Sequence, residues 1–376
     1  MLPWPAVPRA SAAHPTQGEN AMQVLESMAT SRHEQVLFCR NESVGLRAII
    51  AIHDTTLGPA LGGCRLYPYT TEGDALEDVL RLARHMTYKA AMAGLDLGGG
   101  HSVILGERGI KSKALFRTFG RHVESLGGRY ICAEDMNTTV ADMSAIRRET
   151  RWVVGVGHHE GGTGDPAPFC ALGVFHGIRA CLEVVYGSPD PAGRTVAIQG
   201  VGNVGYHLAR FLHQAGAELM YCDFDSRRLE RVLAEFGGVV LEGDDFWSAD
   251  CDVLSPCAIG GVVNQYSIPL INAPIVAGGA NRVLDDEARD GAALVERGIT
   301  YAPDYVVNSG GLISVHSELT GWGRGKVEDD TAGIFVTTKR VLNKASAEGT
   351  TTIEASNRLA EQRIEQVALL RRLHIG

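Results

Sequence analysis

Apolar residues follow two patterns in the first part of the chain: the first is typical of a strand, and the second is typical of a helix. Residues 45–53, GLRAIIAIH, form a short apolar run typical of a strand, and the glycine-rich GPALGGCRL after them is interpreted as a loop. In the next segment apolar residues recur at intervals of three and four, which places them on one face of a helix. They are Leu76, Val79, Leu80, Ala83 and Ala90.

The ends of this helix carry their own signals, and they place a lysine in its last turn. Thr71 and Asp74 have the spacing of a capping box, and Gly94 is typical of a helix stop. Lys89 then lies among small and apolar residues, where an unpaired ammonium is unfavourable. Two interpretations follow: a cation that the helix dipole favours near a C-terminus, or a binding group for an anion.

The alternation of strands and helices continues and predicts an α/β fold. Three glycines precede the buried strand HSVILG, a helix follows around residues 111–126, and the strand YICAED comes next. Glycine-dense residues 155–168 are interpreted as a hinge or a cleft lining. Beyond them TVAIQG, AELMYCDFD, CDVLSP, APIVAG and ITYAP predict strands. Residues 329–370 are expected to be helical, with a break at EGTTTIEA.

A dinucleotide-binding pattern opens this second unit. GVGNVG follows an apolar strand and begins an amphipathic helix, and Asp223 ends the next strand at the expected offset of about 20 residues. Asp223 would bind ribose hydroxyls and favour NAD, although Arg227 and Arg228 leave NADP open. The alternative to a cofactor site is that these glycines form only a turn within a packed core. The glycines of the pattern are Gly200, Gly202 and Gly205.

Composition narrows the class of protein. The chain has 376 residues, enough for two domains, with 45% hydrophobic residues. A net charge of −9 without a long basic run argues against nucleic acid or an anionic membrane as the partner, and no apolar run reaches the ~20 residues of a membrane span. The 8 scattered cysteines indicate reduced thiols and a cytoplasmic protein. Residues 1–21, rich in Pro and Ala, predict a disordered leader.

Three local patterns have plain structural interpretations. HHEGG at residues 158–162 lacks the H-E-x-x-H spacing, so no metal site is expected. Cys257 in SPCAIGG has no neighbouring base and is not expected to act as a nucleophile. Asp135 in AEDMNTT, taken alone, could be the N-cap of the helix that follows.

Six stretches carry more information together than each does alone. HDTTLGPALGGCRLYPY, MTYKAAMAGLDLGGG, RYICAEDMNTTVADM, GVGNVG, SPCAIGG and YAPDYVVNSGG occur in one uninterrupted order from about residue 35 onward. In this they resemble the amino acid dehydrogenases acting on leucine, valine and phenylalanine, a family that includes tryptophan dehydrogenase and, more distantly, glutamate dehydrogenase. The resemblance implies NAD-dependent, reversible oxidative deamination of an L-amino acid to a 2-oxo acid and ammonia.

The resemblance also implies a division of the chain. Residues 22–165 would form an α/β domain for substrate binding and oligomerisation, and residues 166–325 a Rossmann-like NAD-binding domain. Residues 326–376 would form helices that return to the first domain, with the active site in the cleft between the two domains. A homo-oligomer, at least a dimer, is expected.

Residue roles are carried over only where residues match. Lys89 matches the lysine that holds the substrate carboxylate, Asp135 the acid that exchanges a proton with the amino nitrogen, and Asn308 an asparagine that contacts substrate and nicotinamide. The other substrate-side candidates are Gly62, Gly63, Met86 and Val315. The cofactor-side candidates are Thr163, Gly200, Gly202, Asn203, Val204, Gly205, Asp223, Cys257, Ala258, Ile259, Asn281 and Asn308.

The side-chain pocket would be apolar, which favours aliphatic or aromatic substrates over glutamate, because no second cation is visible to pair a side-chain carboxylate. Its lining is expected near Leu61, Met86, Ala133, Leu312 and Val315.

One position departs from the family pattern. A second, catalytic lysine follows the triple glycine in the family, and this chain has His101 there. A neutral imidazole can act as a base near pH 7, but its reach is shorter and its geometry stiffer. Three hypotheses stay open: an amino acid dehydrogenase with His101 as base, a specialised biosynthetic oxidoreductase that reduces a preformed imine or oxidises an amino acid without managing hydrolysis, and a non-catalytic protein that binds NAD and an amino acid.

Overall fold

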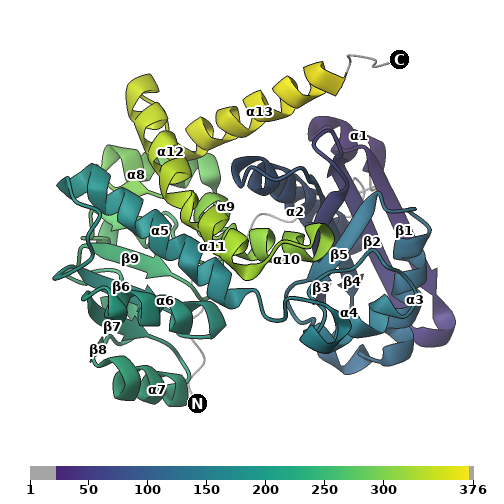
Figure 1. The fold of residues 1–376 in the computed structure, drawn as a ribbon, viewed down its shortest axis with the longest axis horizontal. Coiled ribbons are helices and arrows are strands. Elements are labelled where there is room, and N and C mark those ends of the chain that lie inside the picture. The colour runs from purple at the N-terminus through teal and green to yellow at the C-terminus, as the bar shows by residue number, and fades with distance from the viewer. Residues whose placement is uncertain (1–22, 372–376) are drawn as a thin grey trace, which may run out of the picture.

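The computed structural model describes residues 23–371, so the leader expected at residues 1–21 lies outside the described residues. Each half of the chain forms one sheet, and the C-terminal helices lie between the two sheets and above them (Figure 1). The expected two-part α/β fold is confirmed.

The first sheet has five strands with helices on both faces. Its strands are β1 (Gln35–Asn41), β2 (Leu46–Asp54), β3 (Ala60–Tyr67), β4 (Gly98–Leu105) and β5 (Tyr130–Glu134), and its helices are α1 (Val24–Thr30), α2 (Glu72–Met92), α3 (Lys113–Glu124) and α4 (Val140–Arg147). The strand order is β1-β2-β4-β3-β5; β2 is antiparallel to β1 and β4, whereas β3 is parallel to β4 and β5. Helix α2 packs on one face through Leu76 and Val79, and α3 packs on the other through Phe116 and Phe119.

The stretch GPALGGCRL contains strand β3, so its interpretation as a loop is wrong. β3 lies between β4 and β5, and its glycines allow the neighbouring backbone to approach closely. A Cβ atom on Gly62 would lie 1.6 Å from the carbonyl oxygen of Gly100. Because glycines replace the apolar side chains that mark a strand, the sequence hides this element.

Helix α2 follows its sequence signals closely. The Thr71 hydroxyl accepts a hydrogen bond from the Asp74 N–H, and the Asp74 carboxylate accepts one from the Thr71 N–H, both at 3.0 Å. The helix ends at Met92, and Gly94 adopts the left-handed conformation with φ +75°. Lys89 therefore lies in the last turn, as expected.

The second sheet has six parallel strands in the order β11-β10-β9-β6-β7-β8. They are β6 (Thr195–Gln199), β7 (Glu218–Cys222), β8 (Val239–Val240), β9 (Val253–Pro256), β10 (Ile275–Val276) and β11 (Thr300–Tyr301), and their helices are α5 (Ala167–Tyr186), α6 (Asn203–Gln214), α7 (Ser226–Phe236) and α8 (Glu287–Glu296). Parallel strands with helical crossovers are the Rossmann-like arrangement that the glycine pattern predicts.

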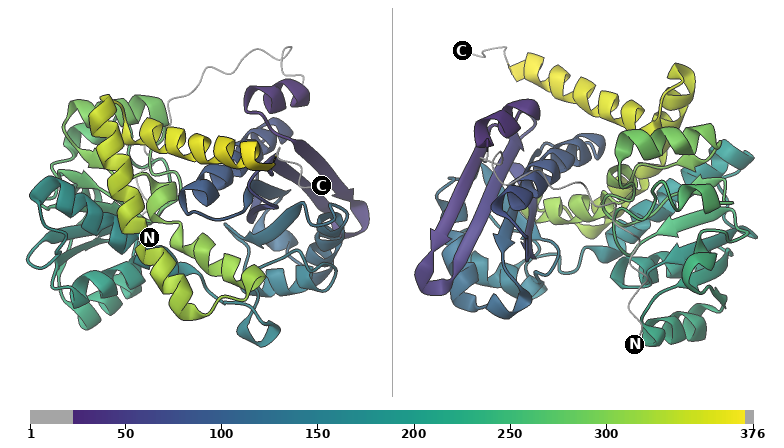
Figure 2. Two further views of the ribbon diagram at one scale, coloured as in Figure 1. Left: turned by 45° about the horizontal axis from the view of Figure 1, so that its top comes forward. Right: turned by 180° about the vertical axis from the view of Figure 1, so that it is seen from behind.

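Five helices complete the described chain: α9 (Asp304–Val307), α10 (Gly310–Thr320), α11 (Arg324–Ala332), α12 (Ile334–Glu348) and α13 (Thr352–Arg371). Gly349, with φ +63°, separates the last two at the predicted break. Helix α12 lies beside α5, and α13 then turns back across the molecule toward α2 (Figures 1 and 2).

Helix α5 is long and apolar enough to cross a membrane by length and composition, which the sequence expectation missed. Its buried residues pack against α6, α10 and α12, and they include Val174, Ile178 and Leu182. We therefore interpret α5 as the core helix of the second half.

Besides His101, the first half of the chain buries two neighbouring histidines, His33 and His53. The His53 ring contacts the Thr87 hydroxyl at 2.8 Å and the Ser31 carbonyl at 2.9 Å, and the His33 ring lies 4.8 Å away. Burial, and to a smaller extent the neighbouring His33, lowers the pKa of His53 to about 4. Both rings are therefore neutral at pH 7.

Acid should destabilise the protein through His53. Between pH 6.5 and pH 4 the unfolded chain binds a proton at this residue and the folded chain does not, so the free energy of unfolding falls as pH falls, by on the order of 3 kcal/mol. Urea unfolding at a series of pH values measures this slope, and His53→Gln should flatten it. His213→Gln, at an exposed position, is the control; equal slopes in all three proteins would contradict the prediction.

Candidate active site

The ammonium of Lys89 lies where the two halves of the chain meet. Burial lowers its pKa, because the charged form is poorly solvated, while the Cys170 thiol and the Asp304 and Asp135 carboxylates act in the opposite direction. No described residue forms an ion pair or hydrogen bond with this ammonium. Lys89 is therefore a candidate group for binding an anion.

Three neighbouring strands bring His101 and Asp135 together. His101 lies on β4, and Asp135 directly follows β5. The His101 Nδ1 atom accepts a hydrogen bond from the Gly63 N–H of β3 at 3.0 Å, and its Nε2 atom lies 3.3 Å from Asp135 Oδ2. A Cβ atom on Gly63 would lie 2.5 Å from the Asp135 Cβ and 2.8 Å from the imidazole, so only glycine allows this contact.

These contacts determine where the imidazole proton lies. A backbone N–H can only donate, so Nδ1 carries a lone pair and the proton of the neutral ring is on Nε2. Nε2 then donates to the Asp135 carboxylate. Both ring nitrogens of His101 are thus engaged within the protein.

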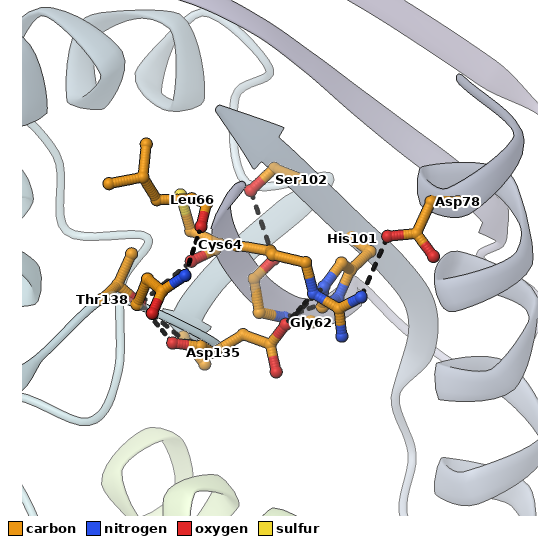
Figure 3. A network of polar contacts seen from close by, with 12 residues as sticks. Gly62, Cys64, Leu66, Asp78, His101, Ser102, Asp135 and Thr138 are labelled. Carbon is orange, nitrogen blue, oxygen red and sulfur yellow. Dashed lines mark hydrogen bonds and ion pairs between the residues drawn. The ribbon is translucent and has the colours of Figure 1, made fainter. Parts of the chain in front are cut away.

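Arg65 of β3 is a second partner of Asp135, and it extends the contact into a network (Figure 3). Its Nε donates to Asp135 Oδ2 at 2.8 Å, and its Nη1 donates to Asp78 Oδ2 at 2.9 Å. Asp78, on α2, also accepts a hydrogen bond from the Tyr69 hydroxyl at 2.6 Å and pairs with Arg81. The Arg65 and Asp135 side chains are 14% and 17% exposed, so water screens this pair little.

The network fixes the charge of Asp135. Burial alone would raise the pKa of this carboxyl group, but the hydrogen bond from His101 and the guanidinium of Arg65 hold the pKa well below its usual range. The carboxylate is ionised at pH 7, and its Oδ1 atom has no hydrogen-bond partner among residues 23–371.

An apolar cluster adjoins these groups. It joins the first sheet to α10, since it contains Leu61 and Ile131 from the strands and Leu312 from the helix. All the residues expected to line the pocket belong to it: Leu61, Met86, Ala133, Leu312 and Val315. Phe169 and Trp322 pack against the same cluster and were missed, because their segments carry no pattern that links them to the first sheet.

The glycine pattern of the second half lines a cavity of ≈ 540 Å³. Gly200 has φ +85°, and a Cβ atom on Gly205 would lie 1.9 Å from the Gly200 carbonyl oxygen, so these glycines allow the turn and the close helix packing. Gly202 is the N-cap of α6 without a side-chain cap, which leaves backbone N–H groups for phosphates. The predicted residues that line the cavity are Gly200, Gly202, Asn203, Val204, Asp223, Cys257, Ala258 and Ile259.

Asn308 carries a buried hydrogen-bond acceptor that suits NAD. Its Nδ2 donates to Asn281 Oδ1 at 2.9 Å, whereas its Oδ1 atom is buried without a hydrogen-bond partner. A buried acceptor left unpaired suits a ligand with an amide or amine donor, and nicotinamide carries such an amide. The side chain of Asp223 faces the same cavity but accepts hydrogen bonds from the Val201 and Asp225 N–H groups at 2.8 and 2.9 Å.

Thr163 is placed differently from the other candidates. Its N–H and hydroxyl both donate to the Glu318 carboxylate at 2.7 Å, which ties the segment between the two halves to the end of α10. Asp135 is not a helix cap, because Thr139 caps α4. The sequence signal for Arg65, one charged residue in an apolar run, was visible but lay in the stretch misread as a loop.

Comparisons with known proteins agree with this geometry. Residues 33–152 match the model described as "Glu/Leu/Phe/Val dehydrogenase, dimerisation domain", and residues 161–227 and 224–372 match "Glutamate/Leucine/Phenylalanine/Valine dehydrogenase". Leucine dehydrogenase of Geobacillus stearothermophilus is 47% identical over 92% of this chain and 94% of its own length. The chain belongs to the Glu/Leu/Phe/Val dehydrogenase family.

Other members of the family extend the comparison. L-tryptophan dehydrogenase of Nostoc punctiforme is 45% identical over 91% of this chain and 96% of its own length. Its crystal structure superposes with a TM-score of 0.80, covering 91% of this chain and 99% of that one. A hetero-hexameric glutamate dehydrogenase from Thermus thermophilus, 21% identical over 93% of this chain and 95% of its own, shares the fold with a TM-score of 0.76.

The family membership confirms the class of reaction. The protein is an NAD-dependent amino acid dehydrogenase, an oxidoreductase acting on a CH–NH₂ group. Its substrates are an amino acid and the corresponding 2-oxo acid.

A double-mutant cycle should expose the coupling in the Arg65–Asp135 pair. Arg65→Gln and Asp135→Asn should each lower the free energy of unfolding by about 2 kcal/mol, because each removes one charged hydrogen-bond partner from a nearly buried network. The double variant should lose clearly less than the sum, as urea unfolding would show. Arg231→Gln, which breaks an exposed pair with Glu235, should cost less than about 0.5 kcal/mol. Strict additivity at Arg65 and Asp135 would refute the coupling.

Proposed function

We propose that this dehydrogenase catalyses reversible oxidative deamination of an L-amino acid with an aliphatic or aromatic side chain. The observation that carries the proposal is the desolvated, partly buried ammonium of Lys89, unpaired in the described chain and close enough to Asp135 and Asp304 for their charges to act on it. An α-carboxylate is the anion that would neutralise it. The apolar cluster of Leu61, Leu312 and Val315 beside it would receive an uncharged side chain.

The chain's own groups then have separate roles. Lys89 binds and orients the substrate carboxylate, and the free Oδ1 of Asp135 exchanges a proton with the amino nitrogen. Bound NAD, held by the glycine turn and by Asn308, supplies the hydride acceptor. The balance is amino acid, NAD⁺ and water giving 2-oxo acid, ammonium, NADH and a proton.

His101 has a narrower role in this proposal than that of a base. Protonation would have to occur at Nδ1, where the Gly63 N–H already points at the lone pair. His101 therefore orients Asp135 through Nε2 and stabilises its negative charge, and Asp135 or water must accept the proton released when the imine is hydrated.

The contacts of both His101 ring nitrogens favour a second candidate function. With both imidazole nitrogens engaged, His101 would not replace the family's second lysine as water activator, so the protein would act best on a preformed imine. A cyclic 2-imino acid carries the carboxylate that Lys89 requires and needs no hydration step.

Two further proposals concern the assembly of the protein and its location in the cell. We propose a homo-oligomer formed through the first sheet, because the segment that matches the dimerisation model contains it and Phe38 on edge strand β1 is 48% exposed. We also propose a cytoplasmic enzyme, supported by all 8 cysteines being free thiols. Size-exclusion chromatography with light scattering tests the first proposal, and fractionation of the producing cell tests the second.

One comparison of products separates the two candidate functions. Apolar and aromatic L-amino acids are incubated with NAD⁺, and NADH and ammonia are followed together; in parallel, NADH oxidation is measured with 2-oxo acid plus ammonium and with the cyclic imine Δ¹-piperideine-2-carboxylate. Equal NADH and ammonia, with efficient reductive amination, support deamination. Rapid reduction of the cyclic imine alone supports the second function. Saturable binding without turnover contradicts both.

Removal of the Lys89 charge should abolish recognition of the carboxylate. Lys89→Met should raise the KM for the amino acid by about 100-fold or more, because the loss of a buried charge-assisted contact is worth several kcal/mol. The KM for NAD⁺ should change little. Lys344→Met, at a residue paired with Glu348 on α12, is the matched control. Unchanged affinity in Lys89→Met would overturn the proposed function.

A further inference from the structure

The C-terminal helix α13 contacts both segments that carry the substrate-side groups, although it contributes no group of its own to the site. Arg363 on this helix reaches the end of α2, next to Lys89. Its Nη1 donates to the carbonyl oxygens of Leu95 at 2.7 Å, Ala91 at 3.2 Å and Ala90 at 3.3 Å. Its Nη2 donates to Asp96 at 3.0 Å.

Ala90 and Ala91 belong to the last turn of α2, where their carbonyl oxygens also accept backbone hydrogen bonds from Leu95 and Gly94, and Leu95 lies just beyond the helix. A guanidinium that binds both carbonyl groups of the turn and the one beyond it holds the turn to the segment that follows, and the helix dipole favours its charge. Lys89 immediately precedes Ala90, so its Cα lies in the turn that Arg363 holds. On the other side of Lys89, the Tyr88 hydroxyl donates to Glu361 of α13 at 2.7 Å.

The same helix also holds the segment that leads to Asn308. The Tyr305 hydroxyl, on α9, bonds to Ser356 and donates to Asn357 Oδ1 at 2.7 Å. Asn308 directly follows α9. Ile353, Ala355 and Ala360 of α13 belong to the hydrophobic core that also contains Tyr88 and Tyr305. Figure 2 shows α13 running from the second half of the molecule across to α2.

We infer that α13 sets the distance between the carboxylate-binding group Lys89 and the amide of Asn308, and that Arg363 is the positioning residue on the Lys89 side. This inference rests on the proposed role of Lys89. Loss of Arg363 frees the last turn of α2 to move relative to α9 while the glycine turn that binds NAD stays intact. The defect therefore falls on the amino acid and not on the cofactor.

Steady-state kinetics of the full chain tests this with L-leucine as the probe. Arg363→Ala should raise the KM for L-leucine about tenfold, with kcat and the KM for NAD⁺ within twofold of the unmodified protein. Arg363→Lys, which keeps the charge and one donor group, should recover most of the loss. Arg358→Ala, on the same helix but paired with Glu348 of α12, is the matched control and should behave as the unmodified protein.

Several results would overturn the inference. An unchanged KM for L-leucine in Arg363→Ala would do so, and so would an equal rise in both KM values, which indicates a general loss of structure. If Arg363→Ala fails to fold, Tyr88→Phe removes only the second contact and should raise the KM for L-leucine about threefold; no rise would refute the role of α13. Lys89→Met distinguishes failure of the proposed function from failure of this inference. If that variant binds L-leucine normally, the proposed function fails. A defect in Lys89→Met without one in Arg363→Ala refutes only the positioning role of Arg363.

Discussion

The desolvated ammonium of Lys89 is the constraint on which the proposed site depends. Transfer of an ion from water into a protein costs several kcal/mol, and no described residue compensates it by direct contact. Helix α2, which carries this residue, is fixed at both ends, by a capping box at Thr71 and by the contacts of Arg363 at the far end. If Lys89 binds a carboxylate as proposed, a charge held in this way requires little rearrangement on binding.

The carboxylate of Asp135, unlike the ammonium of Lys89, has hydrogen-bond partners within the chain. Its Oδ2 atom is shared by Arg65 and His101, whereas its Oδ1 atom has no hydrogen-bond partner among residues 23–371. The guanidinium of Arg65 supplies a fixed positive charge beside this carboxylate. Asp135 therefore has a charged partner that does not depend on His101.

Much of the fold was predictable because local signals agreed with the final packing. The capping box, the apolar face of α2 and the turn at Gly200 each report an element that packs as its own residues specify. Strand β3 was missed because Gly62 and Gly63 serve contacts with β4 and His101 that lie far away in sequence. The His101 proton position was unpredictable for the same reason, since it depends on the backbone N–H of Gly63.

The contacts of α13 show how a site formed by two halves of one chain keeps its geometry. Lys89 and Asn308 are separated by most of the chain, and each lies at the end of a helix that has its own freedom to shift. Helix α13 bonds to both α2 and α9, so it fixes the positions of Lys89 and Asn308 relative to each other. Because Arg363 binds three backbone carbonyls besides the Asp96 carboxylate, it constrains the path of the chain at the end of α2 whatever side chains line the pocket. Changes in the apolar cluster at Leu312 and Val315 would thus leave the backbone contacts of Arg363 in place.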